Sequence, residues 1–191
     1  MRLKVTMPKI NAVKELQNPL FVKAIKIEYT HKAKQKTWEA VLSHNSVSTL
    51  LWHKERNTFV LVKQLRPAIL NADKEDGYTY ELCAGIIDKD ASDAQIAKEE
   101  ILEECGYDVA VQNLERVTKF YPAVGITGAY QKLYYAQIDE SMKVNEGGGL
   151  HDEEIEVIYL PVEEAKAFLF DESKKKAPGL MLAFYWFFEN K

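Results

Sequence analysis

Three glutamates stand close together in the middle of the chain, at positions 100, 103 and 104. On an α-helix, which turns about 100° per residue, Glu100, Glu103 and Glu104 would share one face. Like charges at this spacing destabilise a helix by about 0.2–0.5 kcal/mol per pair, and no lysine or arginine falls on the same face to offset them. A bound divalent cation would offset this repulsion, because Mg²⁺ prefers hard oxygen ligands such as carboxylates. The spacing therefore predicts a metal site, with a solvated acidic face as the alternative.

The segment that carries these glutamates has clear helix boundaries. Ser92 and Gln95 fit a capping box, Asp93 falls in the first turn, and Gly106 stands where helices commonly end. The pattern predicts a helix from Asp93 to Cys105. An apolar stripe beside the acidic face places that face next to the core, and it consists of Ala94, Ala97, Ile101 and Cys105.

Strands are expected on both sides of this helix. FVKAIKIEYT and KTWEAVLSH flank the polar turn His31 to Gln35 and predict a hairpin over residues 21–42. VSTLLWH and TFVLVKQLR predict a second hairpin, whose run Val60 to Val62 indicates a strand buried on both faces. ILNADKEDGY is expected to be a polar loop, and TYELCAG the strand that follows it.

After the helix, VAVQNLERVTKFYPAV, AYQKLYYAQI and IEVIYLPV predict further strands, separated by loops at GITG and KVNEGGGLHDE. Helices are expected to close the chain. The last of them, from Pro178 to Glu189, is apolar nearly all round, which predicts burial in the core or at a subunit interface.

The composition is that of an ordinary globular protein. The 191 residues fit one domain with at most a small appendage, and the net charge of −4 argues against a nucleic-acid partner. We find no signal peptide and no apolar run long enough to cross a membrane, so a cytoplasmic protein is expected. Cys83 and Cys105 are expected to be buried, reduced thiols.

At the acidic segment the chain resembles a known family. Residues 85–107, GIIDKDASDAQIAKEEILEECGY, resemble the Nudix box, G-x5-E-x7-R-E-U-x-E-E-x-G-U, where U is an aliphatic or bulky apolar residue. Ala91 and Glu99 depart from it, standing where the first Glu and the Arg belong. In the family that Arg orients the glutamates by pairing with acidic neighbours, and Lys98 would compensate for its loss only in part. The matching positions are Gly85, Glu100, Ile101, Glu103, Glu104, Gly106 and Tyr107.

The resemblance extends over most of the chain. KQLRPAIL, YELCAG and NEGGGLHDEEIEVIYLP resemble the ADP-ribose pyrophosphatase branch, and ELCAG, EECGY, VGITG and GGGL resemble its UDP-sugar diphosphatase (UDP-glucose pyrophosphatase) group. The resemblance implies an α/β fold, the Nudix α/β/α sandwich around a mixed β-sheet. It also implies a small N-terminal antiparallel β subdomain over residues 1–43, a hydrolase domain over 44–191, and a homodimer.

Roles for individual residues follow from the same resemblance. It implies that the backbone carbonyl of Ala84, together with Glu100 and Glu104, binds metal and that Glu103 shares a second ion. Arg66 would hold the diphosphate, since a guanidinium binds phosphate through two parallel hydrogen bonds. A surface salt bridge is the alternative for Arg66.

The remaining site residues come from three other segments. Glu81 would line the substrate pocket, and Trp38 would stack on the nucleobase unless it is a core aromatic. Glu153 would activate water or complete the metal site, and the glycines Gly147 to Gly149 would let its loop close over substrate. The alternatives to Glu153 are its acidic neighbours Asp152, Glu154 and Glu156.

Together these features predict a Mg²⁺-dependent hydrolase, with Mn²⁺ as an alternative ion, that acts on a nucleoside diphosphate sugar. UDP-glucose would give UMP and glucose 1-phosphate. Two alternatives stay open: an ADP-ribose pyrophosphatase that produces AMP and ribose 5-phosphate, and a Nudix module that binds nucleotide sugars without turnover. The departures at Ala91 and Glu99 motivate the second alternative.

Overall fold

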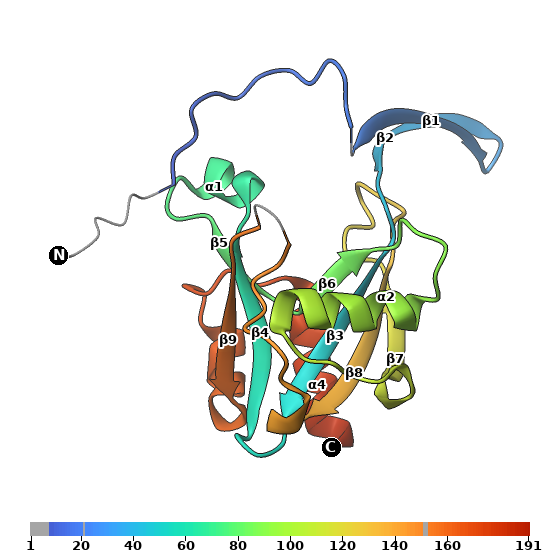
Figure 1. The fold of residues 1–191 in the computed structure, drawn as a ribbon. Helices are drawn as coiled ribbons and strands as arrows, with labels where there is room; N and C mark the ends of the chain where they lie inside the picture. Colours follow the sequence, from blue (N-terminus) through green and yellow to red (C-terminus); the bar gives the residue numbers. More distant parts are fainter. Residues whose placement is uncertain (1–7, 21, 151–152) are drawn as a thin grey trace.

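A mixed β-sheet forms the centre of the molecule and carries helices on both faces (Figure 1). The computed structural model describes residues 8–20, 22–150 and 153–191, and within them the sheet has seven strands. This architecture confirms the predicted α/β class. The strands are β3 (Ser46–His53), β4 (Thr58–Leu65), β5 (Tyr78–Glu81), β6 (Cys83–Ile86), β7 (Glu115–Phe120), β8 (Gln131–Ile138) and β9 (Ile155–Pro161). The helices are α1 (Pro67–Asp73), α2 (Asp93–Glu100), α3 (Ala165–Phe170) and α4 (Pro178–Asn190).

The sheet divides where β3 and β4 separate. The two strands pair at the turn between them, from Leu51–Val60 to His53–Thr58. Farther along, β5 pairs with β4 and β6 pairs with β3, so the predicted single strand TYELCAG is two strands that change partner at Leu82. On their other edges, β3 pairs in parallel with β8 and β4 pairs antiparallel with β9. The chain therefore crosses from one half of the sheet to the other just before Ala84.

Alternate residues of the central strands face opposite helix layers. Leu61 belongs to the apolar cluster that packs against α3 and α4, whereas Val60 and Val62 belong to the cluster under the end of α2. This confirms the prediction of a strand buried on both faces. On the α4 side the rings of Phe59 and Phe184 stack with centroids 4.4 Å apart. The apolar last helix therefore serves the core of its own chain.

The predicted helix from Asp93 to Cys105 is present, but its last turn has a different geometry. The Ser92 hydroxyl accepts a hydrogen bond from the Gln95 N–H at 3.2 Å, and Gly106 ends the helix in the left-handed conformation at φ 77°. Between them, α2 passes into a π-helical turn over Ile101–Cys105. A π turn is wider than an α turn and is frequent at functional sites. Glu103 and Glu104 lie in that turn.

The loop prediction for ILNADKEDGY was wrong in its first half, because α1 extends through Asp73, whereas residues 74–77 do form a loop. Pro67 occupies the first helical turn, where its missing N–H is not needed, and Arg66 before it has an extended backbone. At Gly77, which has φ 70°, the chain turns back and passes against α1. A Cβ at this position would lie only 2.5 Å from the Cβ of Leu70. This tertiary closure, and not local propensity, stabilises a helix of only seven residues.

The predicted N-terminal hairpin is confirmed as β1 (Lys23–His31) and β2 (Lys34–Leu42), which project from the body in Figure 1. Lys32 and Ala33, both at positive φ, form the turn. VAVQNLERVTKF is only partly a strand, since a 3₁₀ turn at Val111–Asn113 precedes β7.

Cys83 and Cys105 are both buried and free, as predicted. Within the part of the chain that the structure describes, no helix has the length and apolar character needed to cross a bilayer.

Candidate active site

The three predicted metal-binding glutamates lie at the junction of α2 and its π turn, over the point where β5 passes into β6. Glu104 is the most buried, with only 6% of its surface exposed, and its Oε2 accepts a hydrogen bond from the Ala84 N–H at 2.9 Å. Burial raises the pKa of Glu104 to about 8, although bonds from Ala84 and Cys83 oppose the shift. The structure therefore brings Glu104 and Ala84 together.

Glu100 packs directly against β6. A Cβ at Gly85 would lie 1.9 Å from Glu100 Oε1, so only glycine leaves room for this carboxylate. Burial and the charge of Glu103 raise the pKa of Glu100 to about 7, and Lys89 opposes them. Two half-buried or buried carboxylates thus stand together with too little positive charge around them.

This donor set fits a divalent cation. Carboxylate oxygens are ligands that Mg²⁺ prefers, and a cation would stabilise the charged forms of Glu100 and Glu104, whose pKa values are raised by burial. Across residues 8–20, 22–150 and 153–191, no group of three or more His, Cys, Asp or Glu side chains is drawn together as a ready-made cage. Mg²⁺ usually takes one or two carboxylates, with water and substrate phosphate completing its shell, so a cage is not required.

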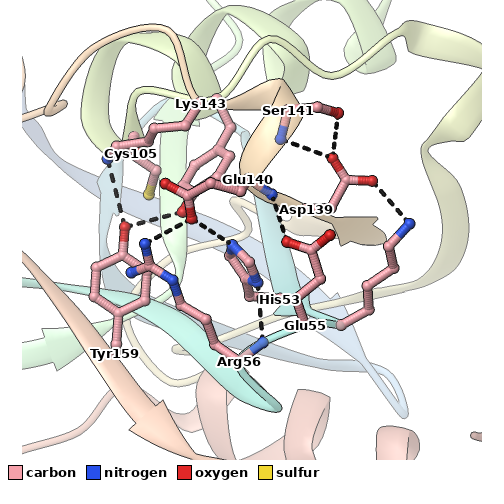
Figure 2. A network of polar contacts seen from close by, with 11 residues as sticks. His53, Glu55, Arg56, Cys105, Asp139, Glu140, Ser141, Lys143 and Tyr159 are labelled. Carbon is pink, nitrogen blue, oxygen red and sulfur yellow. Dashed lines mark hydrogen bonds and ion pairs between the residues drawn. The ribbon is translucent and has the colours of Figure 1, made fainter.

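The end of the π turn is held by groups from a distant part of the chain. Gly148 N–H donates to Glu104 O at 2.9 Å and Gly149 N–H to Glu103 O at 3.1 Å. Lys143 Nζ donates to Cys105 O at 3.2 Å, which places a cation at the negative end of the helix dipole (Figure 2). The triple-glycine loop is therefore bound to the helix that carries the glutamates.

Lys143 also joins this helix end to a polar network at the far end of β3, shown in Figure 2. Its ammonium lies 3.4 Å from the Tyr159 hydroxyl, which is 2.9 Å from that of Tyr107. Arg56 and buried His53 meet at Glu140, 2.6 and 3.4 Å from its Oε2. This network anchors the loop after β8 and, through Lys143, the π turn.

Glu153 follows the triple-glycine loop and faces the other carboxylates. Its Oε2 accepts a hydrogen bond from the Leu150 N–H at 3.0 Å, and its charge contributes to the raised pKa values of Glu100 and Glu104. Among the predicted alternatives, Glu156 forms an ion pair with Lys63 at 3.0 Å, and Asp152 lies outside the described residues. Glu154 is exposed, as is Glu153, but it is not among the charges that act on Glu100 and Glu104.

Arg66 and Glu81 form a second constellation beside the carboxylates. Arg66 Nε and Nη2 donate to the two oxygens of Glu81 at 2.7 and 2.6 Å, and Thr79 Oγ1 donates to Glu81 Oε1 at 2.5 Å. Burial raises the pKa of Glu81, but the bonds from Arg66 and Thr79 outweigh it and leave the pKa below its ordinary value. The charges of Glu104 and Glu153 also act on Arg66. Because 47% of the Arg66 side chain is exposed, its remaining N–H groups are open to a ligand.

Trp38 lies on β2 and is not a core aromatic, since 54% of its surface is exposed. Its indole N–H donates to Gly125 O at 3.1 Å, and the nearby Val41 N–H donates to Ile126 O at 2.8 Å. These bonds attach the hairpin to the predicted GITG loop. Within the described chain, Trp38 forms no hydrogen bond with the other predicted site residues.

One of the two departures from the Nudix box, Glu99, has a structural counterpart that the sequence did not reveal. Glu99 forms an ion pair with Lys89, from the loop before α2, and accepts a hydrogen bond from Gln95 Nε2 at 2.8 Å. The expected compensation by Lys98 is wrong, because Lys98 pairs with Asp108 at 2.9 Å. The loop before α2 is thus attached to the helix by an ion pair between Lys89 in the loop and Glu99 on the helix.

Comparison with known proteins agrees with this site. No protein-family model matches the chain. The chain is 35% identical to uridine diphosphate glucose pyrophosphatase NUDT14 of Bos taurus, over 85% of this chain and 86% of that protein. It is 33% identical to the Mus musculus protein of the same name, over 89% of each. It is also 39% identical to a GDP-mannose pyrophosphatase of Cronobacter sakazakii, over 63% of this chain and 62% of that protein.

The similarity to the two mammalian proteins covers 85% and 89% of this chain, so it extends far beyond the glutamate segment. The chain therefore belongs to the Nudix nucleotide-sugar diphosphatases.

Proposed function

We propose that this chain hydrolyses UDP-glucose to UMP and glucose 1-phosphate in the presence of Mg²⁺, with Mn²⁺ as an alternative ion. The observation that carries the proposal is the pair of neighbouring carboxylates, half-buried Glu100 and buried Glu104, with Arg66 close to Glu104. A diphosphate with its divalent cation fits such a site, since the cation meets the glutamates and Arg66 meets the phosphate. The relatives named for UDP-glucose support the choice of substrate.

Glu100, Glu104 and the carbonyl of Ala84 would hold the ion, and Glu103 would share a second one. When bound, the ion neutralises charge on the diphosphate oxygens and lowers the pKa of a water molecule. Arg66, oriented by both oxygens of Glu81, binds a phosphate through its free N–H groups. Glu153 takes the proton of the attacking water as a P–O bond of the diphosphate breaks.

The first experiment incubates the protein with UDP-glucose and with ADP-ribose, with and without Mg²⁺, and separates the products by chromatography. We expect UMP, formed chiefly from UDP-glucose and only with the metal. AMP formed chiefly from ADP-ribose would make the chain an ADP-ribose pyrophosphatase. No product from either, with tight binding of both, would favour the non-catalytic module.

A variant ties the activity to this site. Glu104→Gln keeps the size of the side chain and removes its charge, and we expect kcat to fall at least ~100-fold. Glu146→Gln is the matched control, because Glu146 is an exposed glutamate of the glycine loop. Equal activity of the two variants would contradict the assignment of the metal helix.

We propose further that the chain acts as a homodimer through its N-terminal hairpin. One face of the hairpin carries six apolar residues, most of them exposed, and a large exposed apolar patch usually marks an interaction site. A hairpin of this kind is barely stable alone, so a second copy is the occupant that we expect. Trp38 belongs to this face and would stack on the nucleobase. The apolar residues of the face are Ile25, Ile27, Tyr29, Trp38, Ala40 and Leu42.

We propose that the protein is cytoplasmic. Both cysteines are free and buried, which suits a reducing compartment.

A further inference from the structure

A cavity of about 720 Å³ opens next to Arg66, between α1, β5 and the segment that leads into α4. This volume falls in the ~300–1,000 Å³ range of small-molecule sites. Arg66 and Glu81 line one part of it, and Ala72, Asp73 and Glu172 line another. The cavity therefore begins at the residue proposed to hold the diphosphate and extends away from it.

One wall of the cavity is built by the segment of residues 171–177. Tyr80 N–H donates to Lys175 O at 2.8 Å, so the segment lies along the free edge of β5. Lys175 Nζ then reaches across to α1, 2.8 Å from Asp73 and 2.9 Å from Asp76. These bonds fix the distance between the segment and α1, and with it the width of the cavity.

The charges of the described residues that line the cavity balance: Arg66, Lys175 and Lys176 stand against Asp73, Glu81 and Glu172. Lys175 is bound by carboxylates, and Lys176 Nζ donates to the carbonyls of Asp171 and Lys174, both at 2.6 Å. The described lining thus carries no net positive charge that would attract a second phosphate. A neutral group suits the remainder of the cavity.

The lining also distinguishes a sugar from a nucleobase. None of the described residues that line the cavity is aromatic, so a flat base would find no stacking partner there. Exposed carboxylates at Asp73 and Glu172 accept hydrogen bonds from hydroxyl groups. We infer that this cavity binds the sugar half of the nucleotide sugar, and that Ala72 on α1 sets how large a sugar it accepts. This inference rests on the proposed function and deepens it.

The test fills the cavity from α1. Ala72→Phe adds a ring at an exposed lining position, and Ala68→Phe adds the same ring elsewhere on α1, at an exposed position that does not line the cavity. Equal thermal midpoints would establish that both variants fold. Activity is then compared in two series: UDP-glucose against the smaller UDP-xylose, and UDP-glucose against ADP-glucose.

We expect Ala72→Phe to lower kcat/KM for UDP-glucose at least ~10-fold more than for UDP-xylose, because loss of space for one hydroxymethyl group discriminates on that scale. The ratio between UDP-glucose and ADP-glucose should stay unchanged. Binding gives a second readout that needs no turnover. In calorimetry with Mg²⁺ present, the Ala72→Phe substitution should weaken the binding of glucose 1-phosphate and leave the binding of UMP unchanged.

Two results would overturn the inference. If Ala72→Phe changed the ratio of kcat/KM between UDP-glucose and ADP-glucose but not that between UDP-glucose and UDP-xylose, the cavity would bind the nucleoside. If Ala72→Phe behaved like Ala68→Phe, the cavity would take no part in substrate binding. Failure of the proposed function looks different, since the unaltered protein would then hydrolyse none of the three nucleotide sugars.

Discussion

Gly85 is the residue on which the position of Glu100 depends most directly. A Cβ at this position would overlap the Glu100 carboxylate, so Gly85→Ala must push the side chain out of place. Because misplacement of about 1 Å can cost ~100-fold in rate, we expect kcat to fall by roughly that factor. The Mg²⁺ concentration needed for half of the thermal shift should rise as well.

Gly128→Ala is the control for this prediction, since a Cβ at Gly128 would meet nothing within 4 Å. It should leave both kcat and the Mg²⁺ response unchanged. A Gly85→Ala protein that responds to Mg²⁺ like the original would show that Glu100 does not need its present position.

The ion pair between Lys89 and Glu99 is expected to hold the loop before α2 in place. Glu99→Lys would set two ammonium groups against each other, shift the loop before α2 and raise the Mg²⁺ midpoint a few-fold. The double variant Lys89→Glu/Glu99→Lys restores an ion pair with the charges exchanged and keeps the net charge of the chain. It should recover the Mg²⁺ midpoint, measured by thermal shift. Additive losses in the double variant would mean that the pair does not position the helix.

Among the elements, the triple-glycine loop and the π turn depend on each other. A Cβ at Gly147, which has φ 72°, would lie 2.3 Å from Glu104 O. We expect Gly147→Ala to cost about 1–3 kcal/mol, the usual scale of a strained backbone conformation. Urea unfolding would measure it, with Glu146→Ala as the control at the exposed neighbouring position. An unchanged midpoint would mean that the loop does not support the helix end.

The sequence predicted elements well where the pattern is local. Ser92 and Gly106 located both ends of the acidic helix, and the continuous apolar run from Val60 to Val62 identified a doubly buried strand. The sequence did not predict elements whose structure depends on contacts with distant parts of the chain. Neither α1, which is closed by Gly77, nor the strand break at Leu82 follows from its own residues.

The candidate site shows the same limit. Spacing and resemblance predicted Glu100, Glu104, Arg66 and Glu153 as site residues, and the structure brings these four near one another. The Lys89–Glu99 pair was missed, because a loop lysine ten positions before a helical glutamate carries no pattern. The wall formed by residues 171–177 was missed too, since only its bonds with β5 and α1 reveal it.

For the whole molecule, the exposed hairpin predicts assembly. Ile27→Lys places a charge in the apolar face, and we expect it to give a monomer by light scattering after size-exclusion chromatography. Thr37→Lys adds the same charge to the opposite face of the hairpin and should leave a dimer. Monomeric behaviour of the unaltered chain would refute the proposed homodimer.

The pairing of β3 with β8 fixes when the active site can form during synthesis. Ser46 lies opposite Gln131 in a parallel pair. The carbonyls at the end of the acidic helix accept hydrogen bonds from Gly148 and Gly149, which follow more than 40 positions later in the chain. Such distant pairings make folding slow. A growing chain can therefore make its acidic helix early, yet it cannot complete the site until Gly148 and Gly149 have left the ribosome.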